Sequence, residues 1–416
     1  MSKKIYKIKN TCRLCKSSNI LKVVEIGETP VSEKYSDKKN QKPEDTLVPL
    51  DLYFCLDCSH VQLIHVVDPD FLWDNFTFKT SRNPKLSSHY TNYVKDLLSY
   101  SKKFMSKGFV VDIGSNDGTL LKIFKENGFK KILGIDPAKE IAKEASDNGI
   151  ETIPKYFNYE LSDKIKSRHG KANVVTANNV YAHIDDMDEI TNSIKNILNK
   201  DGIFSFEVSY LQDVIEKKLL GTIFHEHLSY HSLSAFQKYF KEKDLEIINV
   251  IRNPLQGGSI VCYVQHKGGK YPISKSVKQI LDNEEKLKIN KKESLEKFNI
   301  ELQNVKEKLN KTLDTLRQQN KKIAGFGSAR SATTLINYFN INSKFLYIVD
   351  DNKDKHFKFT PGNRIEVFPT KKIYEDEIDF LIIFAWEHSK KIMDSHKKFS
   401  EKGGKFINIF PEIQIV

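Results

Sequence analysis

Short apolar runs alternate with amphipathic segments through the middle of the chain. Each run ends close to a glycine or a polar residue, and lysine and glutamate fill most polar positions of the segments between them. The alternating pieces are FVVDIG (109–114), LLKIFKENG (120–128), KKILGID (130–136), AKEIAKEAS (138–146) and ANVVTANN (172–179). This alternation predicts buried parallel strands joined by crossover helices, so the expected fold class is α/β.

The same alternation returns near the C-terminus. It runs through KIAGFGSARSATTLINYF (322–339), KFLYIVDDN (344–352), DFLIIFAW (379–386) and KFINIF (405–410). We therefore expect a second α/β unit there.

A helical pattern separates the two units. Within residues 274–319, which are rich in lysine and glutamate, apolar residues recur at steps of three and four: Leu295, Phe298, Leu302, Val305, Leu309, Leu313 and Leu316. The spacing predicts an amphipathic helix. A free coiled coil is the alternative, but only a few heptads are present, which favours a helix packed between two domains.

Composition narrows the class of protein. Of the 416 residues, 39% are hydrophobic and 11% aromatic, which excludes a disordered or collagen-like chain. The longest apolar run, residues 380–386, is far short of the roughly 20 residues that cross a bilayer. The basic N-terminus MSKKIYKIKN has no apolar stretch after it, unlike a signal peptide. We expect a cytoplasmic protein with no membrane partner.

Four of the five cysteines form two CxxC pairs. Cys12 and Cys15 precede Cys55 and Cys58 by a gap of 39 residues, and only Cys262 stands alone. Two such pairs can present four thiolates in the tetrahedral geometry that Zn²⁺ accepts, and His60 could replace one ligand. The alternatives are two disulfides, which a reducing cytoplasm disfavours, or a redox motif, which needs one pair and not two. We expect a structural zinc ion that folds a small N-terminal module.

A glycine turn follows the strand FVVDIG. Gly114 allows a tight reversal of the backbone, and Gly118 allows a ligand to approach the N-terminus of the next helix. The spacing GxxxG differs from the GxGxxG fingerprint, which argues against NAD. Asp136 ends the second strand, 18 residues after Gly118, where a carboxylate can accept both hydroxyls of a ribose.

Polar residues at the ends of the other strands complete this crevice. Asp112 ends the first strand, Asn116 lies in the turn, and Asn178 and Asn179 follow the fourth strand. The order of these parts resembles that of class I S-adenosylmethionine (SAM) methyltransferases. The resemblance implies a Rossmann-like methyltransferase domain whose SAM contacts are Asp112, Gly114, Asn116, Gly118, Asp136, Asn178 and Asn179. A nucleotide-binding fold without catalysis is the alternative.

Residues 204–236 carry most of the candidate chemistry. They contain Glu207, Tyr210, His225, Glu226, His227 and His231, and His183 belongs to the loop after the fourth strand. A metal site is one hypothesis, but the spacing is not HExxH. A surface loop with satisfied histidines is another. The third is acid–base chemistry, in which an imidazole takes a proton from the substrate and an adjacent carboxylate fixes its tautomer.

A further glycine loop opens the C-terminal unit. In Gly325-Phe-Gly327-Ser-Ala-Arg330, backbone N–H groups at a helix start can face an anion, and a basic residue there suits a pyrophosphate better than NAD. Asp350 and Asp351 could hold a ribose or form a solvated turn. A scaffold role is the alternative for the whole unit.

From end to end, the chain resembles the nucleotide-linked 4-keto-sugar C-methyltransferases that install branch methyls on deoxysugars. The resemblance rests on the two CxxC pairs and on VDIGSNDGTLL, NNVYAHI, FEVSY, TIFHEHLSYHSL, GGSIVCYV, GFGSARSATTLINY, YIVDDN, FTPG, FAW and PEIQIV. It implies a zinc module, a SAM domain and a C-terminal Rossmann-like domain that helps to bind the sugar nucleotide. The divisions we expect are residues 1–80, 81–268, 269–320 (the helical connector) and 321–416.

The resemblance also implies roles for individual residues. His227, backed by Glu226, is the leading candidate base; His183 and His225 complete the catalytic group, and Glu207, Tyr210, Gly327 and Arg330 are the candidate substrate ligands. A base beside a ketone can form an enolate that attacks the sulfonium methyl, with no metal needed at this step.

Two departures and two alternatives accompany this prediction. The family often has tyrosine at the position of Phe224 and in a connector motif that aligns to Phe76 and Phe78, and phenylalanine cannot donate a proton. O-methylation of a sugar nucleotide is therefore the first alternative. The second is a zinc-containing nucleic-acid-binding or nucleic-acid-modifying protein, suggested by the net charge of +12 (66 basic and 54 acidic residues). Because residues 271–320 mix 11 basic with 8 acidic side chains, no basic stripe supports it, and we expect no nucleic-acid partner.

Overall fold

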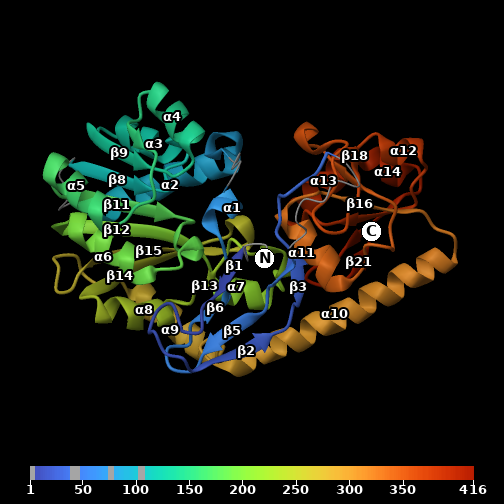
Figure 1. Ribbon diagram of the computed structural model, residues 1–416, viewed down its shortest axis with the longest axis horizontal. Coiled ribbons are helices and arrows are strands. Elements are labelled where there is room, and N and C mark those ends of the chain that lie inside the picture. The colour runs from blue at the N-terminus through green and yellow to red at the C-terminus, as the bar shows by residue number, and fades with distance from the viewer. Residues whose placement is uncertain (1–4, 38–46, 74–78, 102–107) are drawn as a thin grey trace.

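A computed structural model describes residues 5–37, 47–73, 79–101 and 108–416 of the protein. Figure 1 shows a seven-stranded sheet on the left and a six-stranded sheet on the right, with the N-terminal strands below and between them. Among the described helices, none is long and apolar enough to cross a membrane.

The seven-stranded sheet has the order β10-β9-β8-β11-β12-β15-β14. All neighbours pair in parallel except β15, which is antiparallel to both β12 and β14. This is the class I methyltransferase fold, as the sequence predicts. The strands are β8 (Phe109–Ile113), β9 (Lys131–Ile135), β10 (Thr152–Ile153), β11 (Ala172–Asn178), β12 (Leu198–Ser209), β14 (Leu245–Asn253) and β15 (Ser259–His266).

Helices cover both faces of this sheet, which explains why strand β8 is buried along its whole length. Apolar residues of α2 and α3 pack on one face, and those of α5, α6 and α8 pack on the other. The helices are α2 (Pro84–Ser101), α3 (Thr119–Glu126), α4 (Lys139–Asp147), α5 (Tyr159–His169), α6 (Met187–Ile197), α7 (Leu211–Glu216) and α8 (Leu233–Glu242). Short 3-10 turns are η2 (Tyr181–His183), η3 (Leu220–Thr222) and η4 (Leu255–Gly257).

The C-terminal unit is the second α/β fold. Its sheet order is β18-β17-β16-β19-β20-β21, with only β21 antiparallel to its neighbour. Its strands are β16 (Ile323–Phe326), β17 (Ile348–Asp350), β18 (Val367–Pro369), β19 (Phe380–Ile383), β20 (Lys405–Asn408) and β21 (Gln414–Ile415). Its helices are α11 (Arg330–Phe339), α12 (Lys372–Glu375), α13 (Ser389–Ser395) and α14 (Lys397–Glu401), with 3-10 turns η5 (Lys353–Lys355) and η6 (Trp386–His388).

The N-terminal module is built from short antiparallel strands. A four-stranded sheet has the order β13-β6-β5-β2, and two pairs, β1 with β7 and β3 with β4, flank it. The strands are β1 (Tyr6–Ile8), β2 (Ile20–Val24), β3 (Glu28–Pro30), β4 (Leu47–Pro49), β5 (Leu52–Cys55), β6 (Val61–Gln62), β7 (His65–Val67) and β13 (Ser229–Tyr230). Because β13 comes from the HEH stretch, the N-terminal sheet is completed by the methyltransferase domain. The predicted domain boundaries stay predictions.

The connector consists of two helices rather than one. α9 (Lys275–Lys286) is followed by α10 (Lys292–Gln318), and all seven apolar residues of the predicted stripe are buried on α10. They share one core with residues of the N-terminal sheet and of α11. α10 therefore runs along the edge of the molecule from the N-terminal module to the C-terminal unit (Figure 1). Earlier in the chain, α1 (Pro69–Trp73) and η1 (Thr80–Arg82) lead into α2.

Candidate active site

The four cysteines of the CxxC pairs form one cluster. Their Sγ atoms all lie within 4.8 Å of one another, with Cys12 and Cys58 at 3.5 Å and Cys15 and Cys55 at 3.5 Å. A tetrahedral zinc ion with Zn–S bonds of about 2.3 Å needs sulfur atoms roughly 3.8 Å apart, so the donor set fits Zn²⁺. His60 is not part of the cluster, because its Nε2 shares a hydrogen bond of 3.1 Å with the Ser229 hydroxyl.

The predicted SAM crevice lies at the carboxyl ends of β8, β9 and β11. The turn after β8 needs left-handed backbone at Gly114 (φ 71°), Asn116 (φ 51°) and Gly118 (φ 78°). A Cβ on Gly114 would lie 2.5 Å from the Val180 side chain, so only glycine fits there. Asp136 accepts hydrogen bonds of 2.9 Å from the backbone N–H groups of Asn116 and Ala138, which ties the second strand to the turn.

The remaining predicted SAM residues line the same edge. The carboxyl of Asp112 accepts a 2.6 Å bond from Thr176, and burial raises its pKa to about 7 despite that bond. Asn178 is buried at the end of β11, and Asn179 has φ 57° with its N–H bonded to the Glu207 carbonyl at 2.8 Å. The turn and the Asp136 carboxylate suit the ribose and backbone contacts of an adenosine cofactor. When bound, SAM supplies an electrophilic methyl group here.

Two histidine rings meet beside this crevice. The ring centroids of His183 and His227 are 5.1 Å apart. The Nδ1–H of His183 donates to the Glu226 carbonyl at 2.7 Å, and the Nδ1–H of His227 donates to the Thr222 carbonyl at 2.8 Å. Because a carbonyl only accepts, the proton of neutral His227 sits on Nδ1 and its lone pair on Nε2. Burial lowers the pKa of His183 to about 4 and that of His227 well below its ordinary value, so both are neutral at pH 7.

Glu226 has a different partner from the one that the sequence predicts. Its carboxylate accepts from the Arg330 Nε at 3.1 Å and from the Ser32 hydroxyl at 3.5 Å. The expectation that Glu226 fixes the tautomer of His227 is therefore corrected: the Thr222 carbonyl does so. Glu226 and Arg330 instead join the methyltransferase domain to the C-terminal unit, with Ser32 of the N-terminal module at the same place.

Two other predictions are corrected by burial. His225 is 1% exposed, and its Nε2 donates to the Val48 carbonyl of β4 at 2.9 Å. Tyr210 is fully buried, and its hydroxyl donates to Glu284 at 2.8 Å. In this structure each of these two polar atoms anchors a neighbouring element.

Because His225 is buried in its neutral form, acid should weaken the fold. Burial lowers the pKa of His225 to about 4, whereas an unfolded histidine titrates near 6.5. Below pH 6.5 the histidine is protonated in the unfolded chain but still neutral in the folded protein. The free energy of unfolding therefore falls by about 1.4 kcal/mol per pH unit until the pH reaches the folded pKa of about 4. In thermal unfolding from about pH 7 to pH 5, we expect His225→Gln to lose less stability than the wild type. An equal pH slope in both proteins would contradict this assignment.

Glu207 lies behind a histidine that the sequence prediction missed. Its carboxylate accepts from His89 Nε2 at 2.7 Å, from Asn253 Nδ2 at 2.7 Å and from the Ser259 hydroxyl. Burial alone would raise the pKa of Glu207, but His89 and the other donors lower it overall. Glu207 is therefore connected through His89 and Asn253 to a cavity that these two side chains line.

Two cavities meet at the start of α2. One of about 460 Å³ is lined by Pro84, Lys85, Ser88, His89, Asn92, Asn253 and Leu255. The other, of about 360 Å³, is lined by Lys85, Glu387, His388, Lys390, Lys391, Asp394 and Ser395. Both include Lys85, so they adjoin between the methyltransferase domain and the C-terminal unit. The spacing of Lys85, Ser88, His89 and Asn92 on one helical face could have revealed this lining in the sequence.

In the glycine loop of the C-terminal unit, residues of the same unit contact Gly327 and accept the bond from the Ser328 N–H. Gly327 has φ 91°, and a Cβ there would lie 2.6 Å from Ala385. The Ser328 N–H donates to the Asp350 carboxylate at 2.7 Å. The backbone geometry thus explains Gly327 without a ligand, and Asp350 caps the loop instead of holding a ribose. Arg330 stays a candidate substrate ligand.

Of the three phenylalanines that depart from the family pattern, the structure describes only Phe224. The ring of Phe224 lies 4.0 Å from that of His227 between centroids, so an aromatic residue there packs against the candidate base. Phe76 and Phe78 lie outside the residues that the structure describes.

Comparison with known proteins agrees with this architecture. Three family models match successive parts of the chain: "Putative zinc binding domain" over residues 12–73, "Methyltransferase domain" over 86–250 and "C-methyltransferase C-terminal domain" over 254–411. The C-methyltransferase NovU of Streptomyces niveus is 30% identical over 406 residues, which are 97% of this chain and 96% of NovU.

Solved structures are matched more distantly. A SAM-dependent methyltransferase from Anabaena variabilis is 16% identical with a TM-score of 0.34, over 42% of this chain and 84% of its own. Magnesium protoporphyrin IX methyltransferase from Synechocystis, with bound SAH, is 12% identical with a TM-score of 0.35, over 47% and 91%.

The match to NovU extends over nearly the full length of both chains, and the three domain models follow in the order of the structure. The strand order of the central sheet is independently that of a class I methyltransferase. The chain belongs to the C-methyltransferase family that includes NovU, and it is a SAM-dependent methyltransferase.

Proposed function

We propose that the protein transfers the methyl group of SAM to a carbon next to the ketone of a nucleotide-linked keto-sugar. The observation that carries this proposal is the tautomer of His227. Its Nδ1–H is held by the Thr222 carbonyl, so Nε2 has its lone pair available beside the SAM crevice. A neutral, positioned imidazole can act as the general base for carbanion formation next to a ketone.

A cation lies close enough to offset the charge of the enolate. The Arg330 guanidinium pairs with the Glu226 carboxylate, and the backbone carbonyl of Glu226 accepts a hydrogen bond from the His183 ring at 2.7 Å, which supports a cation close to His183. Glu226 holds Arg330 at 3.1 Å. We propose that His227 accepts the α-proton and that the Arg330 guanidinium stabilises the resulting enolate oxygen.

The cavities at α2 support an anionic, polar substrate. In their lining Lys85, Lys390 and Lys391 outnumber the carboxylates Glu387 and Asp394, so positive charge is in slight excess. His89, Asn92 and Asn253 contribute hydrogen-bonding groups. A sugar nucleotide has a diphosphate for the first set and hydroxyl groups for the second. We propose that the nucleotide lies between the methyltransferase domain and the C-terminal unit, with Glu207 fixing His89 behind the sugar.

The family relation favours carbon over oxygen as the methyl acceptor, and the test separates the two directly. The full-length enzyme is incubated with SAM and a panel of nucleotide-linked keto-sugars in deuterated buffer. We expect one sugar to exchange its α-hydrogen for deuterium and to gain a methyl group on that carbon. A methyl ether formed without exchange would overturn the proposal in favour of O-methylation.

A further inference from the structure

Arg13 is a fully buried charge inside a zinc knuckle. It lies between Cys12 and Cys15, and its side chain is 0% exposed. A buried charge is strongly unfavourable unless it is paired and hydrogen-bonded. The contacts that Arg13 makes must therefore be specific.

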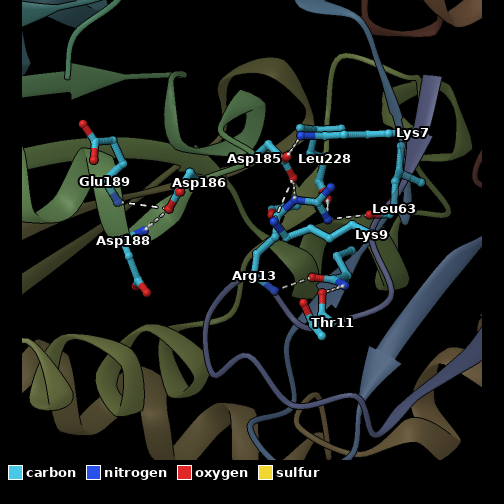
Figure 2. A network of polar contacts seen from close by, with 12 residues as sticks. Lys7, Lys9, Thr11, Arg13, Leu63, Asp185, Asp186, Asp188, Glu189 and Leu228 are labelled. Atoms are coloured by element: carbon cyan, nitrogen blue, oxygen red, sulfur yellow. Dashed lines mark hydrogen bonds and ion pairs between the residues drawn. The ribbon is translucent and has the colours of Figure 1, made fainter. Parts of the chain in front are cut away.

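These contacts join three separate segments (Figure 2). Its Nη1 donates to the carbonyl of Leu63 and, at 3.3 Å, to that of Leu228. Its Nε lies 3.2 Å from a carboxylate oxygen of Asp185. Its backbone N–H donates to Gln62 at 2.8 Å, which fixes the knuckle on β6.

Two of the three segments carry the histidines of the candidate active site. Leu228 directly follows His227, and Asp185 lies two residues after His183. Asp186, the next residue, caps α6 by accepting from the N–H groups of Asp188 and Glu189 at 3.2 and 3.1 Å. The loop between His183 and α6 is thus held at Asp185 by Arg13 and at Asp186 by the helix.

Asp185 also receives lysines of the N-terminal module. Lys7 lies 2.8 Å and Lys9 3.3 Å from its carboxylate. Lys7 is 70% exposed, so its ion pair is screened by water, whereas Arg13 is enclosed. Arg13 is therefore the most enclosed of the three cations at Asp185, ahead of Lys9 at 23% exposed.

We propose that Arg13 is a positioning residue, which transmits the geometry of the zinc knuckle to His183 and His227. The two cysteines that flank Arg13 fit Zn²⁺, so the ion would set the direction in which its guanidinium points. The guanidinium holds Leu228 and Asp185 at a fixed separation, and with them the two rings. The zinc module then has a role in alignment as well as in folding. The part of this inference that concerns catalysis rests on the proposed role of His227.

The test compares Arg13→Met with Lys16→Met in the full-length enzyme saturated with SAH. Lys16 lies in the same knuckle, where its Nζ pairs with Asp188 at 3.0 Å and donates to the Arg13 carbonyl at 2.9 Å. It bonds neither to Asp185 nor to Leu228, so Lys16→Met is the control for loss of a basic side chain of this knuckle that leaves the Arg13 guanidinium contacts in place. The histidine rings are labelled with ¹³C, and NMR measures the chemical shift of each ring signal and its change with pH. Zinc content and SAM affinity are measured on the same proteins. His183→Ala and His227→Ala assign the two signals.

We expect Arg13→Met to shift the signals of both His183 and His227, with one zinc per chain retained, while the His396 signal of the C-terminal unit stays in place. Methyl transfer should then fall by about 10²-fold, the loss that a displacement near 1 Å can cause, with SAM affinity unchanged. Lys16→Met should change none of these. Unmoved His183 and His227 signals in an Arg13→Met protein that keeps its zinc would overturn the proposal.

A second variant covers the case in which Arg13→Met does not fold. Asp185→Asn leaves the knuckle intact and should shift the His183 signal more than that of His227, because only the His183 loop loses its charge pair. Equal or absent shifts would also contradict the proposal. The ring signals are recorded without substrate, so they test positioning even if His227→Ala proves active and the proposed base is wrong.

Discussion

Replacing His227 with alanine is expected to abolish methyl transfer while leaving SAM binding intact. A positioned general base contributes about 10²–10⁴-fold to a rate, and the ring of His227 is the one whose Nδ1–H is held by the Thr222 carbonyl. The predicted SAM contacts are on other segments, namely the turn after β8, Asp136 and the end of β11, so removal of the His227 ring takes none of them away. Steady-state kinetics on the sugar nucleotide found by the screen, with calorimetric titration of SAM, would measure both effects.

The pH dependence of methyl transfer is a second test of His227 as the base. Burial and the neighbouring His183 hold the pKa of His227 well below its ordinary value, so the base stays deprotonated as the pH falls through 6.5. Activity should therefore remain level from about pH 7 to pH 6, where an exposed histidine would already be losing it. His169→Ala, at the end of α5, serves as the control for loss of a histidine elsewhere. Undiminished turnover in His227→Ala would remove it as the base.

Replacing Cys55 with serine is expected to release the zinc ion and to unfold the N-terminal module. Binding of a structural zinc ion supplies about 10–16 kcal/mol in small zinc domains, and serine cannot replace a thiolate ligand. We expect zinc content to fall from one per chain to none and the protein to aggregate, since β13 loses its partner β6. Metal analysis and the soluble yield after expression check both.

The fifth cysteine provides the matched control. Cys262 is fully buried in β15 and is not among the four clustered sulfurs. Cys262→Ala should therefore keep one zinc per chain even if it lowers the melting temperature. Retention of one zinc per chain by Cys55→Ser would contradict the assignment of Cys55 as a ligand.

Local spacing predicted the features that depend on neighbours in sequence. The helical stripe from Leu295 to Leu316 is buried along α10 as its three- and four-residue steps require. The strand endings predicted the edge where Asp112, Asp136 and Asn178 gather, because parallel strands present their carboxyl ends together. In both cases the pattern repeats within a few residues.

Pairings between distant segments were not predictable in this way. Adjacency in the sequence suggested that Glu226 supports His227, yet its carboxylate meets Arg330, which is 104 residues away. His225 and Tyr210 looked available because the residues that bury them, in β4 and α9, belong to other parts of the chain. A single sequence shows which side chains are present, but the partner of each is decided by the tertiary fold.

Strand β13 also sets the order in which the chain can fold during synthesis. Its residues, Ser229 and Tyr230, pair with Gln62 and Val61 of β6, which lie 167 and 169 residues earlier in the chain. The four-stranded sheet of the N-terminal module therefore stays incomplete on the ribosome until the first five strands of the methyltransferase sheet have been made. During that interval the edge of β6 that will pair with β13 has unpaired backbone groups, which can pair with a strand of another nascent chain. Early capture of zinc by the two knuckles would hold this edge in place while the rest of the chain emerges.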